Sequence, residues 1–188
     1  MESIRLFSRK VAACRRCDLC IERKRAVFGQ GKTNRPTVMF IGEGPCTADE
    51  ARGTVFTGKV GTELRRLCRA AGLSPSETYR TNICKCCPPN NRPPVAEEML
   101  SCLPWLREQV AIIRPKVIVA FGLPAAAILV KSHGRAAKHL GRWSRFGGVP
   151  MLSTYHPAYL LRWPPARNDA LADFKKVARR LAKDNKQL

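Results

Sequence analysis

The sequence lacks any long apolar run, and this absence narrows the class of protein. No stretch approaches the roughly 20 apolar residues needed to span a bilayer. The N-terminal stretch MESIRLFSRKVAACRRC has no continuous apolar core of the signal-peptide type. We therefore expect a soluble, cytoplasmic, intracellular protein without membrane contact.

Acidic residues are also scarce, which points to a negatively charged partner. There are 14 Asp and Glu against 34 Lys and Arg, a formal net charge of +20. Such an excess favours nucleic acid as the partner, although charge alone does not separate DNA from RNA or from an acidic membrane surface. The 188 residues, 45% of them hydrophobic, suffice for one domain with a real core. We expect a monomer made of a single domain over residues 1–188.

Strand-like and helix-like segments alternate along the chain. Short β-prone runs predict strands at 37–41, 79–84, 116–122 and 149–155, and apolar periodicity predicts helices at 2–13, 60–72, 95–113, from 124, and at 168–183. The proline-rich run after Cys84 and the basic segment 131–148, which holds His133 and His139, are expected to be loops. This alternation predicts an α/β fold with a parallel sheet and right-handed crossovers.

Polar side chains follow three of the predicted strands. Glu43 comes directly after the first strand, Asn82 lies near the end of the second, and His156 follows the fourth. Ligands of open α/β sheets bind past the carboxyl ends of the strands, so these groups are candidates for one site. Each also has a structural alternative: Asn82 can satisfy backbone groups, and His156 can be a turn residue before proline.

Nine cysteines are many for an intracellular protein, and they suggest metal binding or chemistry before disulfides. Cys14, Cys17 and Cys20 repeat the CxxC spacing. Thiolates are ligands of zinc and of iron–sulfur clusters alike. The spacing by itself leaves a zinc site, an iron–sulfur site and stray thiols open.

Four motifs in register resemble those of the family 4 uracil-DNA glycosylases, the iron–sulfur enzymes of the uracil-DNA glycosylase superfamily. They are GEGP with its following acids, VFTGKVG, YRTNICKCCPPNNRPP and TYHPAYLLR. The resemblance extends from Cys14 to about Asp173. It implies a three-layer α/β/α sandwich around a central four-stranded parallel sheet. It also implies a monofunctional, nucleoid-associated enzyme that flips uracil out of DNA and hydrolyses its N-glycosidic bond, which initiates base-excision repair of deaminated cytosine.

The resemblance further implies a [4Fe-4S] cluster, held in part by the N-terminal segment. The family's ligand positions correspond to Cys14, Cys17, Cys86 and Cys102. Three other cysteines lie close enough in the sequence to compete as ligands, namely Cys20, Cys84 and Cys87. Of these we consider Cys84 the weakest, because we expect it to lie within the second strand.

The same resemblance implies roles for the residues at the strand ends. Glu43 positions or activates the attacking water, and His156 donates a hydrogen bond to uracil O2 as the base leaves. The Asn82 amide pairs with uracil O4 and N3–H, whereas cytosine presents the opposite pattern. Phe56 stacks on the extruded base.

Binding roles are implied for the turns around these groups. Gly42 and Gly44 belong to the substrate-binding turn, and Asp49 excludes thymine by crowding the C5 edge of uracil. The family usually has GEAPG, so Cys46 replaces a glycine here, which puts the loop shape or the substrate range in question.

DNA contacts are implied for the segment after His156. Leu160 and Leu161 wedge into the gap that the flipped base leaves, and Arg162 holds a flanking phosphate together with basic residues of 131–148. No KRRIH-like insertion of the UdgX type follows the second strand, so we expect turnover and no covalent capture of DNA.

Three alternative functions remain at this stage. The first is a glycosylase of the same superfamily with a broader range that includes hypoxanthine or xanthine. The second is a metal-stabilised, zinc-containing nucleic-acid-binding protein without catalysis, which leaves the polar groups at the strand ends unexplained. The third is an iron–sulfur redox protein, against which no second cofactor motif is visible.

Overall fold

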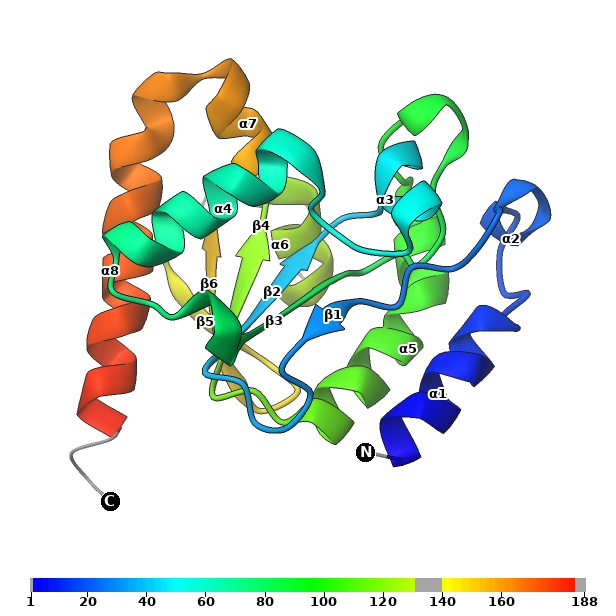
Figure 1. Cartoon of the computed structure of the whole chain (residues 1–188), viewed down its shortest axis with the longest axis horizontal. Helices are drawn as coiled ribbons and strands as arrows, with labels where there is room; N and C mark the ends of the chain where they lie inside the picture. Colours follow the sequence, from blue (N-terminus) through cyan, green and yellow to red (C-terminus); the bar gives the residue numbers. More distant parts are fainter. Residues whose placement is uncertain (1, 131–139, 185–188) are drawn as a thin grey trace.

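The computed structural model describes residues 2–130 and 140–184, which build one mostly parallel sheet with helices on both of its faces (Figure 1). The strands of the sheet are β1 (Gln30–Gly31), β2 (Val38–Gly42), β3 (Thr78–Asn82), β4 (Val117–Phe121), β5 (Trp143–Phe146) and β6 (Val149–Thr154). Their order is β1-β3-β2-β4-β6-β5. The fold is therefore α/β, as predicted.

The described sheet has six strands where the sequence predicted four. Strands β3, β2, β4 and β6 pair in parallel, and the two short strands β1 and β5 pair antiparallel at the edges. Strand β5 lies inside the segment 131–148 that was expected to be a loop, so that expectation is wrong for 143–146. Residues 131–139, with His133 and His139, lie outside the described residues.

The helices are α1 (Glu2–Ala12), α2 (Leu19–Glu22), α3 (Thr47–Arg52), α4 (Gly58–Ala70), α5 (Ala96–Ile113), α6 (Leu123–Val130), α7 (Pro157–Arg162) and α8 (Arg167–Asp184). Short 3-10 turns occur at η1 (Pro75–Glu77), η2 (Pro89–Asn91) and η4 (Pro164–Ala166). Helices α2, α3 and α7 were not predicted as separate elements. Within residues 2–130 and 140–184, no helix is both long and apolar enough to cross a bilayer.

Two apolar cores lie on opposite faces of the sheet. Alternating residues of β2 explain the division, because successive side chains of a strand point to opposite faces. Met39 and Ile41 pack with α5 and α6, whereas Val38 and Phe40 pack with α4 and α8. Strands β2 and β4 are buried along their whole length, as expected for a parallel sheet covered on both sides.

The carboxyl ends of the parallel strands meet at one edge of the sheet. Gly42 of β2 is in register with Asn82 of β3, and β4 pairs with β6 up to Phe121 and Thr154. Strand β3 ends at Asn82, so Cys84 lies beyond the strand, which corrects its predicted position. The loops that leave these strand ends form the walls of the candidate site.

Candidate active site

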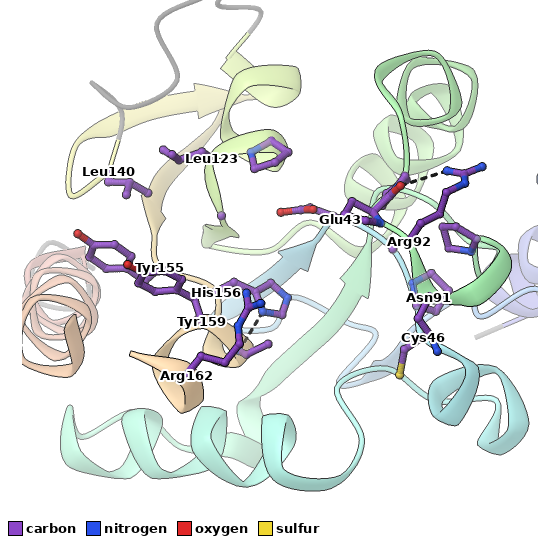
Figure 2. Close-up of a pocket in the computed structure, with 18 residues that line it drawn as sticks. Glu43, Cys46, Asn91, Arg92, Leu123, Leu140, Tyr155, His156, Tyr159 and Arg162 are labelled. Atoms are coloured by element: carbon purple, nitrogen blue, oxygen red, sulfur yellow. Dashed lines mark hydrogen bonds between the residues drawn. The ribbon is translucent and has the colours of Figure 1, made fainter. Parts of the chain in front are cut away.

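A cavity of about 450 Å³ opens at this edge of the sheet. Its walls come from the loop after β2, the proline loop before α5, the start of α6, and the segment from β6 into α7. Figure 2 shows Glu43 and His156 near its centre, with Tyr155, Tyr159 and Arg162 toward one side. Polar groups from separate loops thus share one hollow that lies mostly between apolar and proline side chains.

Glu43 points its carboxylate toward the end of β4. A Cβ at Gly122 would lie 2.6 Å from Glu43 Oε1, and Gly122 has a φ of +87°, so glycine is required there on both counts. The backbone carbonyl of Glu43 accepts a hydrogen bond from Cys84 N–H at 2.9 Å. Burial raises the pKa of the carboxyl group. The fold therefore favours Glu43 as a proton acceptor over an ordinary surface carboxylate.

His156 is held in one orientation by the start of α7. Its Nδ1 accepts a hydrogen bond from the backbone N–H of Ala158 at 3.0 Å. Burial lowers the pKa of the ring to about 4; the charge of Arg162 acts in the same direction and that of Asp49 opposes it. Because Nδ1 is the acceptor, the neutral ring carries its proton on Nε2. His156 is therefore a neutral hydrogen-bond donor at physiological pH.

Asn82 and Phe56 lie beside Gly42, and neither is among the residues that line the cavity. A Cβ at Gly42 would lie 2.4 Å from Asn82 Oδ1 and 3.1 Å from the Phe56 ring, so only glycine fits between them. Among the described residues, neither Oδ1 nor Nδ2 of the buried Asn82 has a hydrogen-bond partner. Such orphaned groups are rare and costly, so their retention favours a ligand partner. The Phe56 and His156 ring centroids are 5.8 Å apart.

Phe56 adopts a backbone conformation that is uncommon for its residue type. Its φ is +54°, in the left-handed region, where a bulky residue is strained. The ring is 5% exposed and packs edge-on against Phe121 at 5.7 Å. The ring contacts with Phe121 and His156 hold this residue in its strained conformation, between the core and the polar groups of the site.

The Asp49 carboxylate forms hydrogen bonds with backbone N–H groups and does not face the cavity. Its Oδ1 accepts from Thr57 N–H at 2.9 Å, and its Oδ2 accepts from Cys46 N–H at 3.4 Å at the start of α3. The side chain is buried and does not line the cavity. The structure thus gives Asp49 a role in fixing the two loops that flank Gly42 and Phe56.

Helix α7 exposes only some of the residues that the sequence analysis assigned to DNA contacts. Leu160 is fully buried in the core, so it is not available to DNA in this structure, which corrects the expected wedge. Leu161 is half-buried and Arg162 is exposed. Tyr155 and Tyr159 stack at 5.4 Å with an interplanar angle of 11°, and both line the cavity.

The opposite wall contains residues that sequence reasoning missed. Arg92 lines the cavity and pairs with Glu98 through two hydrogen bonds of 3.0 and 2.6 Å, which fix the proline loop to α5. Asn91 also lines it and accepts from Thr47 N–H at 2.7 Å. Cys46, the residue in place of the usual glycine, is exposed on the same wall, and Gly44 lines it too. The NNRPP stretch was recognised as part of a family motif, but no role was assigned to Asn91 or Arg92.

Cysteines gather at a second, much smaller cavity between the N-terminal segment and α5. Five of the nine line it, namely Cys14, Cys17, Cys20, Cys86 and Cys102. Arg23 Nη1 donates to Cys86 Sγ and Trp105 Nε1 donates to Cys14 Sγ, both at 3.1 Å. Across the described segments, no group of three or more His, Cys, Asp or Glu is arranged to hold a metal ion. Cys84 and Cys87 do not line this cavity.

The cysteine sulfurs at this cavity nonetheless fit a metal cluster held by thiolate ligands. The expected ligands, Cys14, Cys17, Cys86 and Cys102, all face the same small space, with Cys20 as a fifth sulfur. N–H donors directed at sulfur are a feature of iron–sulfur sites, where they tune and stabilise the cluster.

Comparison with known proteins gives a consistent picture. The model of the uracil DNA glycosylase superfamily matches residues 28–182. The chain is 36% identical to the Type-4 uracil-DNA glycosylase of Saccharolobus solfataricus over 97% of this chain and 88% of the relative. It is 38% identical to the Type-4 uracil-DNA glycosylase of Pyrobaculum aerophilum over 85% of each chain. A Type-5 uracil-DNA glycosylase of Pyrobaculum aerophilum is 33% identical over 72% of this chain and 58% of the relative.

Proposed function

The chain belongs to the uracil-DNA glycosylase superfamily, and from that membership we infer that it excises uracil from DNA by hydrolysing the N-glycosidic bond. The relatives named Type-4 uracil-DNA glycosylases, which align over most of the chain, support this activity. The observation that carries the mechanism is the meeting of Glu43, Asn82 and His156 at the carboxyl edge of one parallel sheet. The protein is a DNA-repair hydrolase.

Base recognition is assigned to Asn82 and Phe56. Extruding a base from the stack costs a few kcal/mol, which a pocket must offset. The unpaired amide of Asn82 offers one acceptor and one donor, which match uracil N3–H and O4 and mismatch cytosine. Stacking on an aromatic ring contributes roughly 1–3 kcal/mol per base. Asn82 and Phe56 meet at Gly42, directly before Glu43 of the cavity lining, so both are near the cavity although neither lines it.

His156 stabilises the leaving group. When the N-glycosidic bond breaks, negative charge develops on the uracil ring, and the Nε2–H of a neutral histidine strengthens its hydrogen bond to O2 as the charge grows. Loss of one such donor typically costs about 2.7–4 kcal/mol of transition-state stabilisation. The hydrogen bond between Ala158 N–H and Nδ1 supports this role, because it fixes both the tautomer and the ring direction.

Glu43 acts on the attacking water. A buried carboxylate with a raised pKa is better matched to accept a proton near neutral pH than an exposed one. Glu43 and His156 line the same cavity, so one bound nucleotide can contact the water-activating group and the leaving-group donor together. No lysine is placed by the motifs as a Schiff-base nucleophile, so the product is an abasic site with an intact strand.

DNA contacts are assigned to the exposed part of α7. Arg162 is exposed at the mouth of the cavity, where its guanidinium can hold a phosphate next to the flipped nucleotide. Leu161 is half-buried and remains the candidate wedge of the two leucines, because Leu160 is fully buried. The stacked Tyr155–Tyr159 pair offers a second aromatic surface beside the cavity.

For the cysteine cavity, we infer that Cys14, Cys17, Cys86 and Cys102 hold a [4Fe-4S] cluster, as the resemblance to family 4 implies. Such a cluster would crosslink the N-terminal segment, the loop after β3 and α5, which carry these four cysteines. The convergence of these thiols and the N–H donors from Arg23 and Trp105 support the assignment. Absorbance near 400 nm from a brown protein would distinguish iron–sulfur from zinc.

The activity is tested with a 5′-labelled oligonucleotide that holds a single uracil. After incubation without divalent metal, the strand should stay intact on a denaturing gel and break at the uracil only after alkali. An otherwise identical oligonucleotide with cytosine at that position should stay intact throughout. Strand breakage without alkali, or borohydride trapping of a covalent enzyme–DNA adduct, would contradict the monofunctional mechanism.

A further inference from the structure

Lys85 is a buried cation that the mechanism so far does not use. It is 1% exposed, and its Nζ donates to Thr81 Oγ1 at 2.7 Å, to the backbone carbonyl of Asn82 at 2.6 Å and to Gln109 Oε1 at 2.7 Å. None of the ion pairs between described residues includes it. A buried ammonium group is expensive unless its hydrogen bonds are made, and here three neutral oxygens take all three hydrogens.

These hydrogen bonds hold the Lys85 side chain against the carboxyl end of β3. Two of the three acceptors belong to the last two residues of that strand, and the third lies on α5. Gln109 is itself fixed, because its Nε2 donates to the carbonyl of Phe28 and to the hydroxyl of Tyr79. The carbonyl of Asn82 is therefore tied to a rigid network that reaches across to the α5 layer.

The Asn82 side chain depends on this backbone anchor. Its Oδ1 and Nδ2 make no hydrogen bond to described residues, so no polar contact of the amide itself sets its direction. What remains is the backbone of Asn82 and the packing of Gly42 and Phe56. The hydrogen bond from the Lys85 ammonium group to the Asn82 carbonyl adds a strong constraint to that backbone, since charge-assisted bonds are roughly twice as strong as neutral ones.

Lys85 also touches the cysteine cavity. It is among the residues that line that cavity, and its backbone amide interacts with the Cys102 thiol. A single residue thus contacts the proposed cluster site with its backbone and the base-reading residue with its ammonium group.

We propose that Lys85 is a positioning residue for uracil recognition, which holds the Asn82 carbonyl and so aims the Asn82 amide at the base. The proposal rests on the proposed function, in which Asn82 reads uracil. It assigns Lys85 no contact with DNA and no proton transfer.

The test is a double-mutant cycle between Lys85 and Asn82. Single-turnover excision rates are measured for the native protein, Lys85→Met, Asn82→Ala and the double variant. If Lys85 acts through Asn82, Lys85→Met should slow excision about tenfold or more in the native background and by less than about twofold in the Asn82→Ala background. Inhibition by free uracil should weaken in parallel, while affinity for DNA with an abasic site stays within about twofold.

Two further variants separate positioning from folding. Thr81→Val keeps the shape of the strand residue and removes one of the acceptors of Lys85. It should show the same coupling to Asn82→Ala in weaker form, and it replaces Lys85→Met in the cycle if that variant does not fold. Thr78→Val is the matched control, because Thr78 is a buried threonine at the other end of β3 whose hydroxyl donates to Pro75. Its excision rate and uracil inhibition should match those of the native protein.

The possible failures are distinguishable. If Lys85→Met and Asn82→Ala are additive in the cycle, or if Thr78→Val shows the same coupling as Thr81→Val, the positioning role of Lys85 is wrong while uracil excision stands. If Asn82→Ala alone excises uracil at the native rate, the base-reading role of Asn82 is wrong, and the inference about Lys85 is overturned with it.

Discussion

At the scale of single residues, the fold moves the pKa values of two groups in the same cavity in opposite directions. Burial raises the pKa of the Glu43 carboxyl and lowers that of the His156 ring to about 4. Both shifts have one cause, because burial disfavours the charged form of an acid and of a base alike. The result is a proton acceptor and a neutral donor, which suit the two sides of one hydrolysis.

The first prediction concerns His156 and the transition state. Its hydrogen bond to O2 gains strength only as the uracil anion forms, so His156→Ala should lower the single-turnover rate by about two or more orders of magnitude. Affinity for uracil-containing DNA should change by less than about threefold. Rates come from quenched-flow assays and affinities from fluorescence anisotropy. Equal losses of rate and affinity would mean that the histidine only shapes the start of α7.

The second prediction separates Glu43 from His156 by pH. Glu43 serves as a base only when ionised. The excision rate should therefore drop as the pH is lowered through the pKa of Glu43, which burial raises above the ordinary value of 4.5. His156, with a pKa of about 4, stays neutral over that window. Glu43→Gln should therefore be slow and lack this acid limb, whereas His156→Ala should be slow and keep it. An acid limb that persists in Glu43→Gln would contradict the assignment.

Histidine protonation has a separate consequence for stability. The folded pKa of about 4 lies below the ordinary value of 6.5, so the unfolded chain binds the proton more readily between these values. Stability should therefore fall as pH falls from 6.5 toward 4. His156→Ala should reduce this part of the pH dependence in urea unfolding.

The site could be predicted from the sequence only in part. Glu43, Asn82 and His156 were identifiable because polar residues at the ends of parallel strands share an edge. Lys85 was not, because a lysine in a cysteine- and proline-rich run looks like surface charge until the fold buries it. The requirement for Gly122 depends on the position of a carboxylate that is remote in the sequence, which no local pattern encodes.

At the scale of elements, the two leucines of α7 lie in different environments: Leu160 is in the core and Leu161 is half-buried. Leu160→Ala should destabilise the protein by about 2–5 kcal/mol in urea unfolding, because a fully buried leucine leaves a cavity behind. Leu161→Ala is the matched control on the same helix and should cost less than about 1 kcal/mol, since that side chain is half-buried. If Leu160→Ala leaves stability unchanged, the placement of this helix is wrong.

Element prediction succeeded for long periodic segments and failed for short ones. Helix α5 spans Ala96–Ile113 against a predicted 95–113, because its apolar period is long and acids occupy its first turn. Strand β1 has two residues, too few to give a pattern. Strand β5 did have a signal, since Gly147 and Gly148 have φ values of +56° and +79° in the turn to β6, and Gly-Gly is a hairpin dipeptide. The basic composition of 131–148 obscured it.

The cysteine cavity joins three elements, and this yields a prediction about metal content. Cys14→Ala, Cys17→Ala, Cys86→Ala and Cys102→Ala should each lose iron and soluble protein together. Cys46→Ala is the control, since Cys46 is exposed at the other cavity. Iron is measured by colorimetric assay on purified protein. Because Cys20 also lines the cysteine cavity, loss of iron in Cys20→Ala with retention in Cys17→Ala would contradict the ligand assignment.

At the scale of the whole molecule, the net charge of +20 acts over the entire surface. A net charge of that size attracts DNA and accelerates encounter, but it does not by itself place a uracil in the cavity. Productive binding must therefore depend on a few cations beside the cavity. Arg162 lies at its mouth, whereas Arg107 lines a different pocket, with residues just before β4 and in the β5–β6 turn.

This difference gives the last prediction, which compares two exposed arginines of equal charge. Arg162→Ala should weaken binding to a short uracil-containing duplex and reduce the salt slope, d log K/d log[salt], by about 0.9 for one lost phosphate contact. Arg107→Ala removes the same charge from another face and should leave the slope within about 0.2 of the native value. Neither variant should slow excision once DNA is saturated with enzyme, because phosphate contacts position the duplex and do not act on the leaving base. If both substitutions shift the slope equally, binding is governed by net charge rather than by the position of Arg162.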